Sequence, residues 1–335
     1  MRLLVTGGAG YIVSHTALVL LEAGHDIVVA DNLINSKEES LRRVEGITGR
    51  KIEFHQVDLL DAMALDRVFA SGPIEAVIHF AGLKAVGESV RQPTRYFHNN
   101  ITGTLVLCET MQRHGVRTLV FSSSATVYGD PHTVPITEDF PLSATNPYGR
   151  SKLMIEEILR DLSVADPTWR IAILRYFNPV GAHGSGLIGE DPNGIPNNLV
   201  PYIAQVAVGR LDELPVYGND YPTPDGTGVR DYIHVMDLAQ GHERALARLD
   251  NGPGVHTWNL GTGRGYSVME MISAFERASG RTVKYKLMPR RPGDIAVCYA
   301  DPSRAQAELA WSAVRGLDEM CVDAWRWQER NPNGF

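Results

Sequence analysis

Short apolar runs alternate with amphipathic stretches through the first half of the chain. The runs are rich in large aliphatic residues, are too short for buried helices, and lie at 3–5, 27–30, 52–57, 76–80, 119–121 and 171–174. Taken together they are too uniformly apolar for strands that bury only one face, which is typical of strands buried in a parallel sheet. We therefore expect a parallel sheet in this half.

Helical periodicity fills the intervals between these runs. Apolar residues recur at helical spacing in 15–22, 62–69 and 99–114, and each of these segments ends near a glycine. Glycine often terminates a helix because it adopts the left-handed backbone conformation without a steric penalty. The alternation of strand and helix predicts an α/β fold, a doubly wound parallel sheet of the Rossmann type.

The pattern changes after Tyr176. Glycine and proline crowd the segment 179–196, where little periodicity remains. Beyond it we predict a loop at 217–229, strands at 257–260 and 283–286, and helices at 235–249, 268–279 and 317–328. We interpret 1–176 as one domain and 177–335 as a smaller α+β C-terminal domain, with some chain exchange between the two.

Length and charge narrow the classes of function. The chain has 335 residues, of which 44% are hydrophobic and 21% charged, as in ordinary globular proteins. Its 39 acidic and 32 basic residues give a formal net charge of −7. This balance argues against binding to nucleic acid or to an anionic membrane, and it favours small-molecule chemistry.

The sequence also indicates a compartment. No apolar run approaches the ~18 residues of a membrane span, and the start of the chain has no signal-peptide pattern. Cys108, Cys298 and Cys321 form no CxxC pair, and the histidines form no HExxH motif or close cluster with cysteine. We expect no disulfide framework, no metal site and a reducing, cytoplasmic location.

The strongest local motif follows the first predicted strand, where residues 6–12 read TGGAGYI. Gly7 and Gly10 let the backbone turn tightly and approach a pyrophosphate, whose charge the N-terminus of the next helix stabilises. Asp31 ends the second predicted strand, where a carboxylate can accept hydrogen bonds from a ribose diol and repels a 2′-phosphate. The motif favours NAD over NADP, the alternative being a purely structural turn.

One position departs from this dinucleotide fingerprint. A third glycine is expected at position 13, where the chain has Val13. That glycine usually permits close packing of helix on strand, so a branched side chain should push the helix or the adenosine site outward. Two interpretations stay open, a tolerated packing change and weakened binding of the cofactor.

A second motif, NPYGRSK, occupies residues 146–152. Pro147 suits a first helical turn, and Tyr148 and Lys152 then share one face of the helix. A free tyrosine has a pKa of ~10, but a neighbouring ammonium group and an oxidised nicotinamide would lower it. Tyr148 is therefore a candidate catalytic base supported by Lys152, and the alternative is a solvated helix face.

A third motif follows the strand at 119–121, which runs into a hydroxyl-rich segment. Ligands of open α/β sheets bind at the carboxyl ends of the strands, so Ser124 can bind the reacting hydroxyl and relay its proton to Tyr148. Alternatively, these serines only satisfy the backbone at a strand end. That alternative is stronger for Ser122 and Ser123 than for Ser124.

The combination of these motifs resembles the extended short-chain dehydrogenase/reductase family. The residues that carry the likeness are Gly7, Gly10, Asp31, Ser124, Tyr148 and Lys152. From residue 1 to about 330 the chain is similar to that family's nucleotide-sugar 4-epimerases. The segments that carry the likeness read DNLINS at 31–36, HFAGLKAVGES at 79–89, SSSATVYG at 122–129, LRYFNPVGA at 174–182, GIPNNL at 194–199 and GVRDYIHV at 228–235.

The resemblance implies a persistently bound NAD in the first domain and a nucleotide-sugar site in the second. It implies interconversion of UDP-glucose and UDP-galactose, within galactose metabolism, through a 4-keto sugar that rotates and is reduced on its opposite face. It also implies a homodimer formed through 94–112 and 147–162.

The family's contacts carry over residue by residue. Its NAD contacts correspond to Tyr11, Ile12, Asp31, Asn32, Asn35, Ser36, Asp58, Leu59, Phe80, Ala81, Lys84, Asn99, Tyr148, Lys152 and Phe177. Its nucleotide-sugar contacts correspond to Ser124, Asn178, Asn198, Leu199, Tyr217, Arg230, Arg291 and Asp294. Arg230 and Arg291 carry forked donors that suit a diphosphate, with surface salt bridging as the alternative.

A second departure concerns the choice of substrate. Cys298 stands where some members of the family carry a tyrosine beside carbon 2 of the sugar. A smaller side chain leaves volume for an N-acetyl group, so we expect activity on UDP-N-acetylglucosamine and UDP-N-acetylgalactosamine as well. The alternative is a small buried residue with no role in selection.

Two other functions compete with epimerisation. A nucleotide-sugar 4,6-dehydratase needs a further acid and base, which its relatives carry as Asp-Glu, whereas this chain has Ala125 and Thr126 after Ser124. A non-catalytic dinucleotide sensor would be consistent with Val13. Binding alone does not require Tyr148, Lys152 or Ser124, however, and their presence argues for catalysis.

Overall fold

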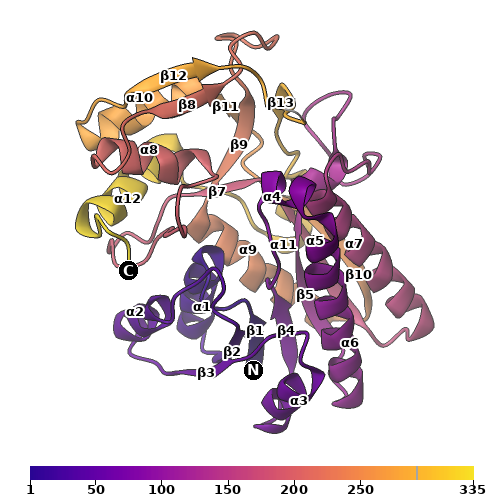
Figure 1. The fold of residues 1–335 in the computed structure, drawn as a ribbon. Coiled ribbons are helices and arrows are strands. Elements are labelled where there is room, and N and C mark those ends of the chain that lie inside the picture. The colour runs from indigo at the N-terminus through magenta and orange to yellow at the C-terminus, as the bar shows by residue number, and fades with distance from the viewer. Residues whose placement is uncertain (292) are drawn as a thin grey trace.

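A seven-stranded parallel sheet forms the centre of the molecule in the computed structural model, which describes residues 1–291 and 293–335 (Figure 1). Its strands are β1 (Arg2–Thr6), β2 (Asp26–Asp31), β3 (Ile52–Gln56), β4 (Ala76–His79), β5 (Thr118–Ser124), β6 (Arg170–Tyr176) and β10 (Gly254–Leu260). They lie in the order β10-β6-β5-β4-β1-β2-β3. The predicted doubly wound α/β fold is confirmed, and each apolar run of the first half lies in one of these strands.

Helices cover both faces of this sheet, because its strands are apolar on both. One face packs against α1 (Tyr11–Glu22), α2 (Glu39–Thr48), α9 (Val235–Arg248) and α11 (Ser303–Leu309), and the other against α3 (Ala62–Ala70), α6 (Gly103–Arg113) and α7 (Pro147–Ala165). In β1, Leu3 and Val5 enter the first core and Leu4 enters the second. This alternation is the ordinary two-residue period of a strand.

Two of the predicted helices begin differently from our expectation. The helix expected at 15–22 already starts at Tyr11, immediately after the glycine-rich turn. The segment 99–114 begins as a π-helical turn, η1 (His98–Thr102), before it continues as α6. The short helices α4 (Val86–Arg91) and α5 (Pro93–Phe97) precede it.

A second unit lies beyond the carboxyl ends of the large sheet (Figure 1). A small sheet is formed by β7 (Asn178–Val180), β9 (Val229–His234), β11 (Gly265–Ser267) and β13 (Val297–Cys298), while β8 (Leu214–Tyr217) pairs with β12 (Tyr285–Met288). Around these strands lie α8 (Leu199–Ala207), α10 (Val268–Ser279) and α12 (Leu317–Arg330), which share a separate apolar core. The predicted helices at 235–249, 268–279 and 317–328 are confirmed, whereas the strand expected at 283–286 is shifted to β12.

The chain passes between the two units more than once. We placed the strand at 257–260 in the C-terminal domain, and this was wrong, because β10 pairs in parallel with β6 along its whole length. The amphipathic helix α9 packs its apolar face on the large sheet and carries the chain back to that edge. The expected exchange between the two halves is therefore substantial, while the division at 176/177 itself stays a prediction.

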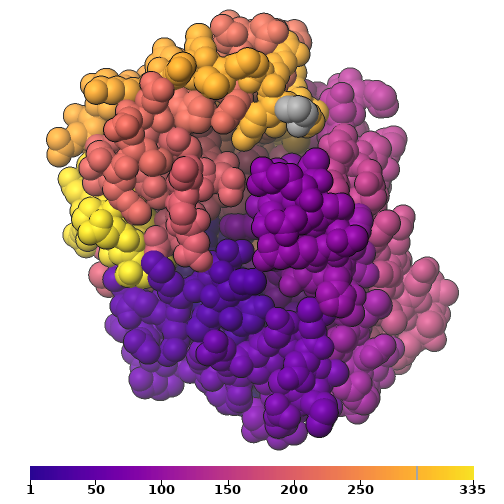
Figure 2. Space-filling view, viewed as in Figure 1, coloured from indigo at the N-terminus to yellow at the C-terminus, as the bar shows by residue number. Residues whose placement is uncertain are grey.

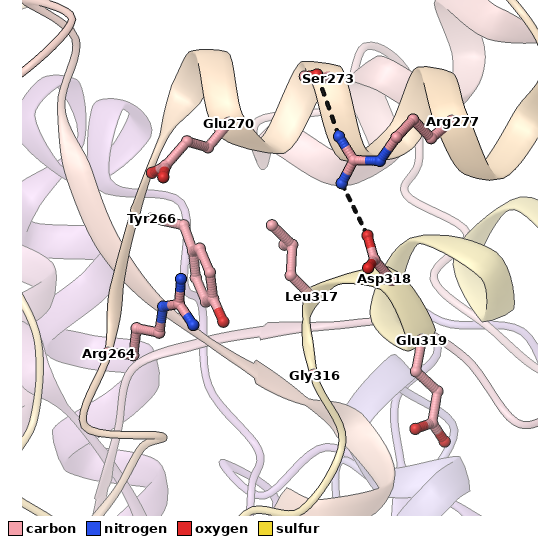
Figure 3. Close-up of a pocket in the computed structure, with 9 residues that line it drawn as sticks. All are labelled: Arg264, Tyr266, Glu270, Ser273, Arg277, Gly316, Leu317, Asp318 and Glu319. Carbon is pink, nitrogen blue, oxygen red and sulfur yellow. Dashed lines mark hydrogen bonds and ion pairs between the residues drawn. The ribbon is translucent and has the colours of Figure 1, made fainter.

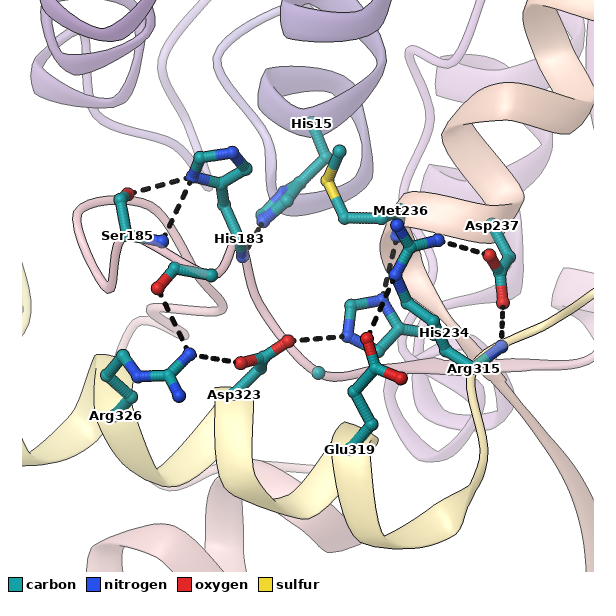
Figure 4. Close-up of polar contacts among 12 residues, drawn as sticks. His15, His183, Ser185, His234, Met236, Asp237, Arg315, Glu319, Asp323 and Arg326 are labelled. Atoms are coloured by element: carbon teal, nitrogen blue, oxygen red, sulfur yellow. Dashed lines mark hydrogen bonds and ion pairs between the residues drawn. The ribbon is translucent and has the colours of Figure 1, made fainter.

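Polar contacts join the first helix to the second unit (Figure 4). The Tyr11 hydroxyl donates to the Gly181 carbonyl at 2.6 Å, and the backbone N–H of His183 donates to Nε2 of His15 at 3.1 Å. On the other side of the same loop, Nε2 of His234 lies 3.2 Å from a carboxylate oxygen of Asp323 in α12. The space-filling view shows the two units in direct contact (Figure 2).

Across the described ranges 1–291 and 293–335, the structure contains no helix that is both long and apolar enough to cross a membrane.

Candidate active site

The glycine-rich turn lies where the strand order of the large sheet reverses. β1 pairs with β2 on one side and with β4 on the other, and such a switch point opens a crevice at the carboxyl ends of the strands. Gly7 has a φ of +70°, and a Cβ there would lie 2.8 Å from the Cα of Ala81, which follows β4. Any side chain at position 7 would therefore be strained and would collide with the backbone.

Close packing of this turn on the sheet depends on Gly8, which sequence reasoning did not single out. A Cβ at Gly8 would lie 2.3 Å from Cγ1 of Val29 in β2. Val13 itself is 4% exposed and belongs to the core between α1 and the sheet. The structure therefore accommodates Val13 by burying it, which favours the interpretation of a tolerated packing change.

Asp31 lies at the carboxyl end of β2 and is buried. Its carboxylate accepts hydrogen bonds from the backbone N–H groups of Ala9 and Leu33, at 3.0 and 2.7 Å, and from the Ser36 hydroxyl at 2.9 Å. It thus ties the glycine-rich turn to the loop after β2. This position at the strand end is where the adenosine ribose of a dinucleotide is bound in such sheets.

The other residues predicted to contact NAD follow the carboxyl ends of successive strands. Tyr11 and Ile12 begin α1; Asn32, Asn35 and Ser36 follow β2; Asp58 and Leu59 follow β3; Phe80, Ala81 and Lys84 follow β4; Asn99 lies in η1; and Phe177 follows β6. Parallel strands end at one edge of a sheet, so the fold gathers these residues along that edge.

Lys152 and Tyr148 lie on α7, which packs along β5. The Lys152 ammonium donates to the Ser122 carbonyl at 2.7 Å and lies 4.9 Å above the Phe121 ring. Burial lowers the pKa of Lys152 to about 8, although the Glu156 carboxylate opposes this shift. Burial also raises the pKa of the Tyr148 phenol, and a hydrogen bond with the Ser124 hydroxyl opposes that rise. The structure thus brings the predicted catalytic residues together.

The three serines at the end of β5 have different partners. Ser122 pairs with the Tyr176 hydroxyl, and Ser123 donates to the Glu156 carboxylate at 2.5 Å. The Ser124 hydroxyl accepts from the backbone N–H and the hydroxyl of Thr126, at 3.2 and 3.0 Å, and keeps its own proton to donate. Ser122 and Ser123 therefore serve the fold, and Ser124 is the serine that meets Tyr148.

Sequence reasoning missed a buried polar network behind these residues. Arg175 in β6 is 2% exposed and forms an ion pair with Glu156 of α7, which is 1% exposed. Arg175 also donates to the Tyr128 hydroxyl at 3.1 Å, and Tyr128 donates to the Asn259 side chain in β10 at 2.7 Å. A signal existed, because charged residues seldom lie inside an apolar strand without a partner.

His79 at the end of β4 is a second buried polar residue that we did not predict. Its Nδ1 lies 2.7 Å from the Thr6 hydroxyl and its Nε2 lies 2.9 Å from the Thr104 hydroxyl. Burial lowers the pKa of His79 to about 3, and the positive charge of Lys152 contributes to this shift. His79 is therefore neutral near pH 7 and links β1, β4 and α6.

The residues predicted to bind the nucleotide sugar fall into small groups. Arg230 in β9 and Cys298 in β13 are paired Cα neighbours, and Cys298 packs in a cluster with Phe177. Arg291 lies 4.8 Å from the centre of the Tyr217 ring.

Other contacts occupy the polar groups of this set. Arg230 donates to the Val229 carbonyl at 2.8 Å, and Arg291 donates to Asp294 at 2.9 Å. The Asn198 amide donates to Glu190 at 2.8 Å. Asn178 is exposed in β7 directly after Phe177, and Leu199 begins α8. Arg291 thus makes the surface ion pair that we weighed as an alternative, which leaves its role toward a diphosphate a prediction.

A surface pocket between α10 and α12 is lined by a different set of residues (Figure 3), although one of them, Tyr266, pairs with Arg230 between β11 and β9. Two of its charged side chains pair with each other, since Arg277 donates to Asp318 at 2.8 Å. Arg277 also donates to the Ser273 hydroxyl at 3.2 Å. None of the residues predicted to bind NAD or the sugar lines it. Within the described ranges, histidine, cysteine, aspartate and glutamate form no group of three suited to a metal ion.

Comparison with known proteins places these observations in a family. Residues 3–261 match the model of the NAD dependent epimerase/dehydratase family. The chain is 65% identical over 335 residues to the UDP-glucose 4-epimerase of Bacillus subtilis, covering 100% of this chain and 99% of that protein.

Solved structures agree with this result. The UDP-glucose 4-epimerase of Bifidobacterium longum in complex with NAD+ and UDP has a TM-score of 0.98 and 57% identity, with 100% of both chains covered. The UDP-Glc/GlcNAc 4-epimerase of Campylobacter jejuni has a TM-score of 0.85 and 38% identity, covering 98% of this chain and 99% of that one.

Proposed function

The chain belongs to the NAD dependent epimerase/dehydratase family, and from that premise we propose that it interconverts UDP-glucose and UDP-galactose as an NAD-dependent isomerase. High identity to a UDP-glucose 4-epimerase over the full length supports this activity. So does the juxtaposition of Ser124, Tyr148 and Lys152 at the carboxyl edge of the sheet. The activity is consistent with a place in galactose metabolism.

The residues of the first unit fit NAD. The backbone of Gly7 lies against Ala81 with no room for a side chain, and Gly10 precedes the first turn of α1 with few atoms near its missing Cβ. The helix N-terminus suits a pyrophosphate, and Asp31 suits a ribose diol. When bound, NAD accepts the hydride from carbon 4 of the sugar and returns it.

The side chains of α7 and β5 supply the acid–base chemistry. Tyr148 accepts the proton of the 4-hydroxyl, directly or through Ser124, and gives it back when the carbonyl is reduced. The Lys152 ammonium favours the phenolate form of Tyr148, since an opposite charge nearby lowers the pKa of a phenol. With a pKa of about 8, Lys152 is mostly protonated at neutral pH and can fill this role.

The pairing of Lys152 with the Ser122 carbonyl beside Ser124 and Tyr148 is the observation that carries this function. We expect purified protein to contain NAD and to interconvert UDP-glucose and UDP-galactose without added cofactor. NAD binding without turnover at any cofactor concentration would instead indicate a sensor. Conversion to a 4-keto-6-deoxy sugar would indicate a dehydratase, although Ala125 and Thr126 in η2 (Ala125–Tyr128) provide no carboxylate.

We propose that the enzyme also acts on UDP-N-acetylhexosamines. Cys298 is a small side chain that lies beside Arg230 and in a cluster with Phe177, two of the residues predicted to contact the sugar or the cofactor. The UDP-Glc/GlcNAc 4-epimerase of Campylobacter jejuni is a structural relative of this chain.

Replacement of Cys298 with tyrosine should narrow the range of substrates. A ring at this position fills the volume needed by an N-acetyl group, so kcat/KM for UDP-N-acetylglucosamine should fall by ~10- to 100-fold while that for UDP-glucose changes little. Cys298→Ser, which keeps the side chain small, is the matched control. Turnover limited to the plain hexoses in the unaltered enzyme would refute the proposal.

We propose that the protein is a homodimer through 94–112 and 147–162, whose helices α5, α6 and α7 gather on one side of the molecule (Figure 1). Leu105 in α6 and Met154 in α7 are large apolar side chains that remain exposed, each at 38%. Burial of such residues against a second copy is favourable. Sedimentation equilibrium should give twice the 36.9 kDa mass of the chain, and a single-chain mass at micromolar concentration would contradict the proposal.

We further propose that the enzyme works in the cytoplasm. All three cysteines are free and buried, which suits a reducing compartment. Cell fractionation that recovers the activity outside the cytoplasm would refute this location.

A further inference from the structure

The buried carboxylate of Glu156 lies one helical turn beyond Lys152 on α7. It accepts a hydrogen bond from the Ser123 hydroxyl at 2.5 Å, and from Nε and Nη2 of Arg175 at 3.0 and 2.5 Å. Ser123 and Arg175 are themselves paired Cα neighbours in β5 and β6. One carboxylate therefore holds two adjacent strands of the sheet to the helix that carries the proposed catalytic base.

Contacts from three successive turns of α7 reach the carboxyl end of β5. Tyr148, Lys152 and Glu156 are spaced by four residues and lie on successive turns of one helix face. They meet three successive serines of the strand: Tyr148 contacts Ser124, Lys152 contacts the Ser122 carbonyl, and Glu156 contacts Ser123. Any slip of α7 along β5 would break all three contacts together.

The buried carboxylate also acts on the charge of Lys152. Lys152 donates to the Ser122 carbonyl on β5, and its charge interacts with those of His79 on β4 and Glu156 on α7. Burial lowers the pKa of His79, which is therefore neutral, and burial raises the pKa of Tyr148 one turn earlier on α7. The Glu156 carboxylate is itself paired with the Arg175 guanidinium on β6. The solvent-side neighbour of Glu156 is Arg160, whose guanidinium lies 3.8 Å from the carboxylate.

We propose that Glu156 is a positioning residue for the epimerase reaction, which fixes α7 in register on β5 and β6 and keeps Lys152 protonated beside Tyr148. The inference rests on the proposed function. The hydrogen-bond and ion-pair partners of Glu156 are Ser123, Arg175 and Arg160, none of which is predicted to contact NAD or the sugar, so Glu156 acts through its neighbours.

Glu156→Gln tests the charge while keeping the shape of the side chain. The carboxylate raises the pKa of Lys152, so its removal should lower that pKa by roughly one unit. The alkaline limb of the kcat profile, where Lys152 loses its proton, should move to lower pH by the same amount. The pKa can be read without turnover from the 13Cε signal of lysine-labelled protein, assigned with Lys152→Met.

Glu157→Gln is the matched control, because it removes the adjacent carboxylate from the exposed face of the same helix. It should leave both the 13Cε titration and the alkaline limb unchanged. Glu156→Asp keeps the negative charge. In this variant the alkaline limb of the kcat profile should lie close to its position in the unaltered enzyme, even if kcat itself is low.

Three results would overturn the proposal. One is a folded Glu156→Gln protein whose Lys152 titrates as in the unaltered enzyme. That variant could fail to fold because Arg175 is left unpaired. In that case the double variant Glu156→Gln with Arg175→Gln replaces it, and the alkaline limb of its kcat profile should move to lower pH by a smaller amount. An alkaline limb that does not move in the double variant is the second result. The third is failure of both to fold while Glu157→Gln folds, which would assign Glu156 to folding alone. Absence of epimerase activity in the unaltered protein, with the NMR shift present, would refute the proposed function and with it the role of Glu156 in that reaction, and would leave only the effect of Glu156 on the pKa of Lys152.

Discussion

Tyr148→Phe should lower kcat for the interconversion of UDP-glucose and UDP-galactose by ~10³-fold. The variant loses the hydroxyl that exchanges a proton with the substrate, and removal of a positioned general base typically costs 10²- to 10⁴-fold. The ring itself remains, so the packing of α7 on β5 should survive and NAD should still bind. Steady-state assay of both directions, together with the NAD content of the purified protein, measures this outcome.

A second phenylalanine substitution separates loss of chemistry from loss of structure. Tyr285 is 44% exposed in β12, in the second unit, and Tyr285→Phe should leave kcat unchanged. If Tyr148→Phe retained more than about a tenth of the original kcat, Tyr148 would not be the principal base, and Ser124 would become the candidate to examine.

Val13→Gly should destabilise the protein by about 2.5 kcal/mol. Deletion of a buried valine side chain removes ~2 kcal/mol of apolar burial, and glycine is less favourable than valine inside a helix by a further ~0.5 kcal/mol. Val13 is buried within α1 and belongs to the same core as Val29 and Leu18. We therefore expect the whole of this loss to appear in the free energy of unfolding. Urea unfolding of the cofactor-free protein measures it.

The same variant decides between the two interpretations of Val13. The side chain is buried in the core, so the NAD dissociation constant of Val13→Gly should stay within about threefold of the original value. A gain of tenfold or more in affinity would show instead that Val13 pushes the adenosine site outward. Val13→Ala keeps a helix-forming residue, and it should lose only the burial part of the stability.

The local chemistry of the cofactor half could be read from the sequence because each motif coincides with a strand end. The segment TGGAGYI after β1, Asp31 at the end of β2 and the serines that end β5 all follow apolar runs. In a parallel sheet such ends meet at one edge, so order along the chain is enough to predict proximity in space. The start of the helix carrying Tyr148 and Lys152 was recognisable from Pro147, and the structure adds Asn146 as its N-cap.

Contacts between distant segments could not be read in this way. The ion pair of Glu156 with Arg175 joins a helix to a strand, and no local period encodes which charged residues will meet. The return of β10 to the edge of the large sheet was missed for a related reason, since 257–260 looks like any short strand. The strands β7, β11 and β13 have two or three residues each, too few to show an alternating pattern.

The contacts that join α1 to the segment after β7 have a consequence for the timing of catalysis. Tyr11 and His15, in the first turns of the helix that would bind the pyrophosphate, are hydrogen-bonded to Gly181 and His183 of the second unit. Opening of the second unit would therefore disturb the cofactor helix as well. The 4-keto sugar must rotate after its hydride has been transferred, so the active site has to stay closed for longer than the rotation takes. We expect these hydrogen bonds between α1 and the second unit to make release of the 4-keto sugar slower than its rotation. Each oxidation is then followed by a reduction, and the products show no net oxidation.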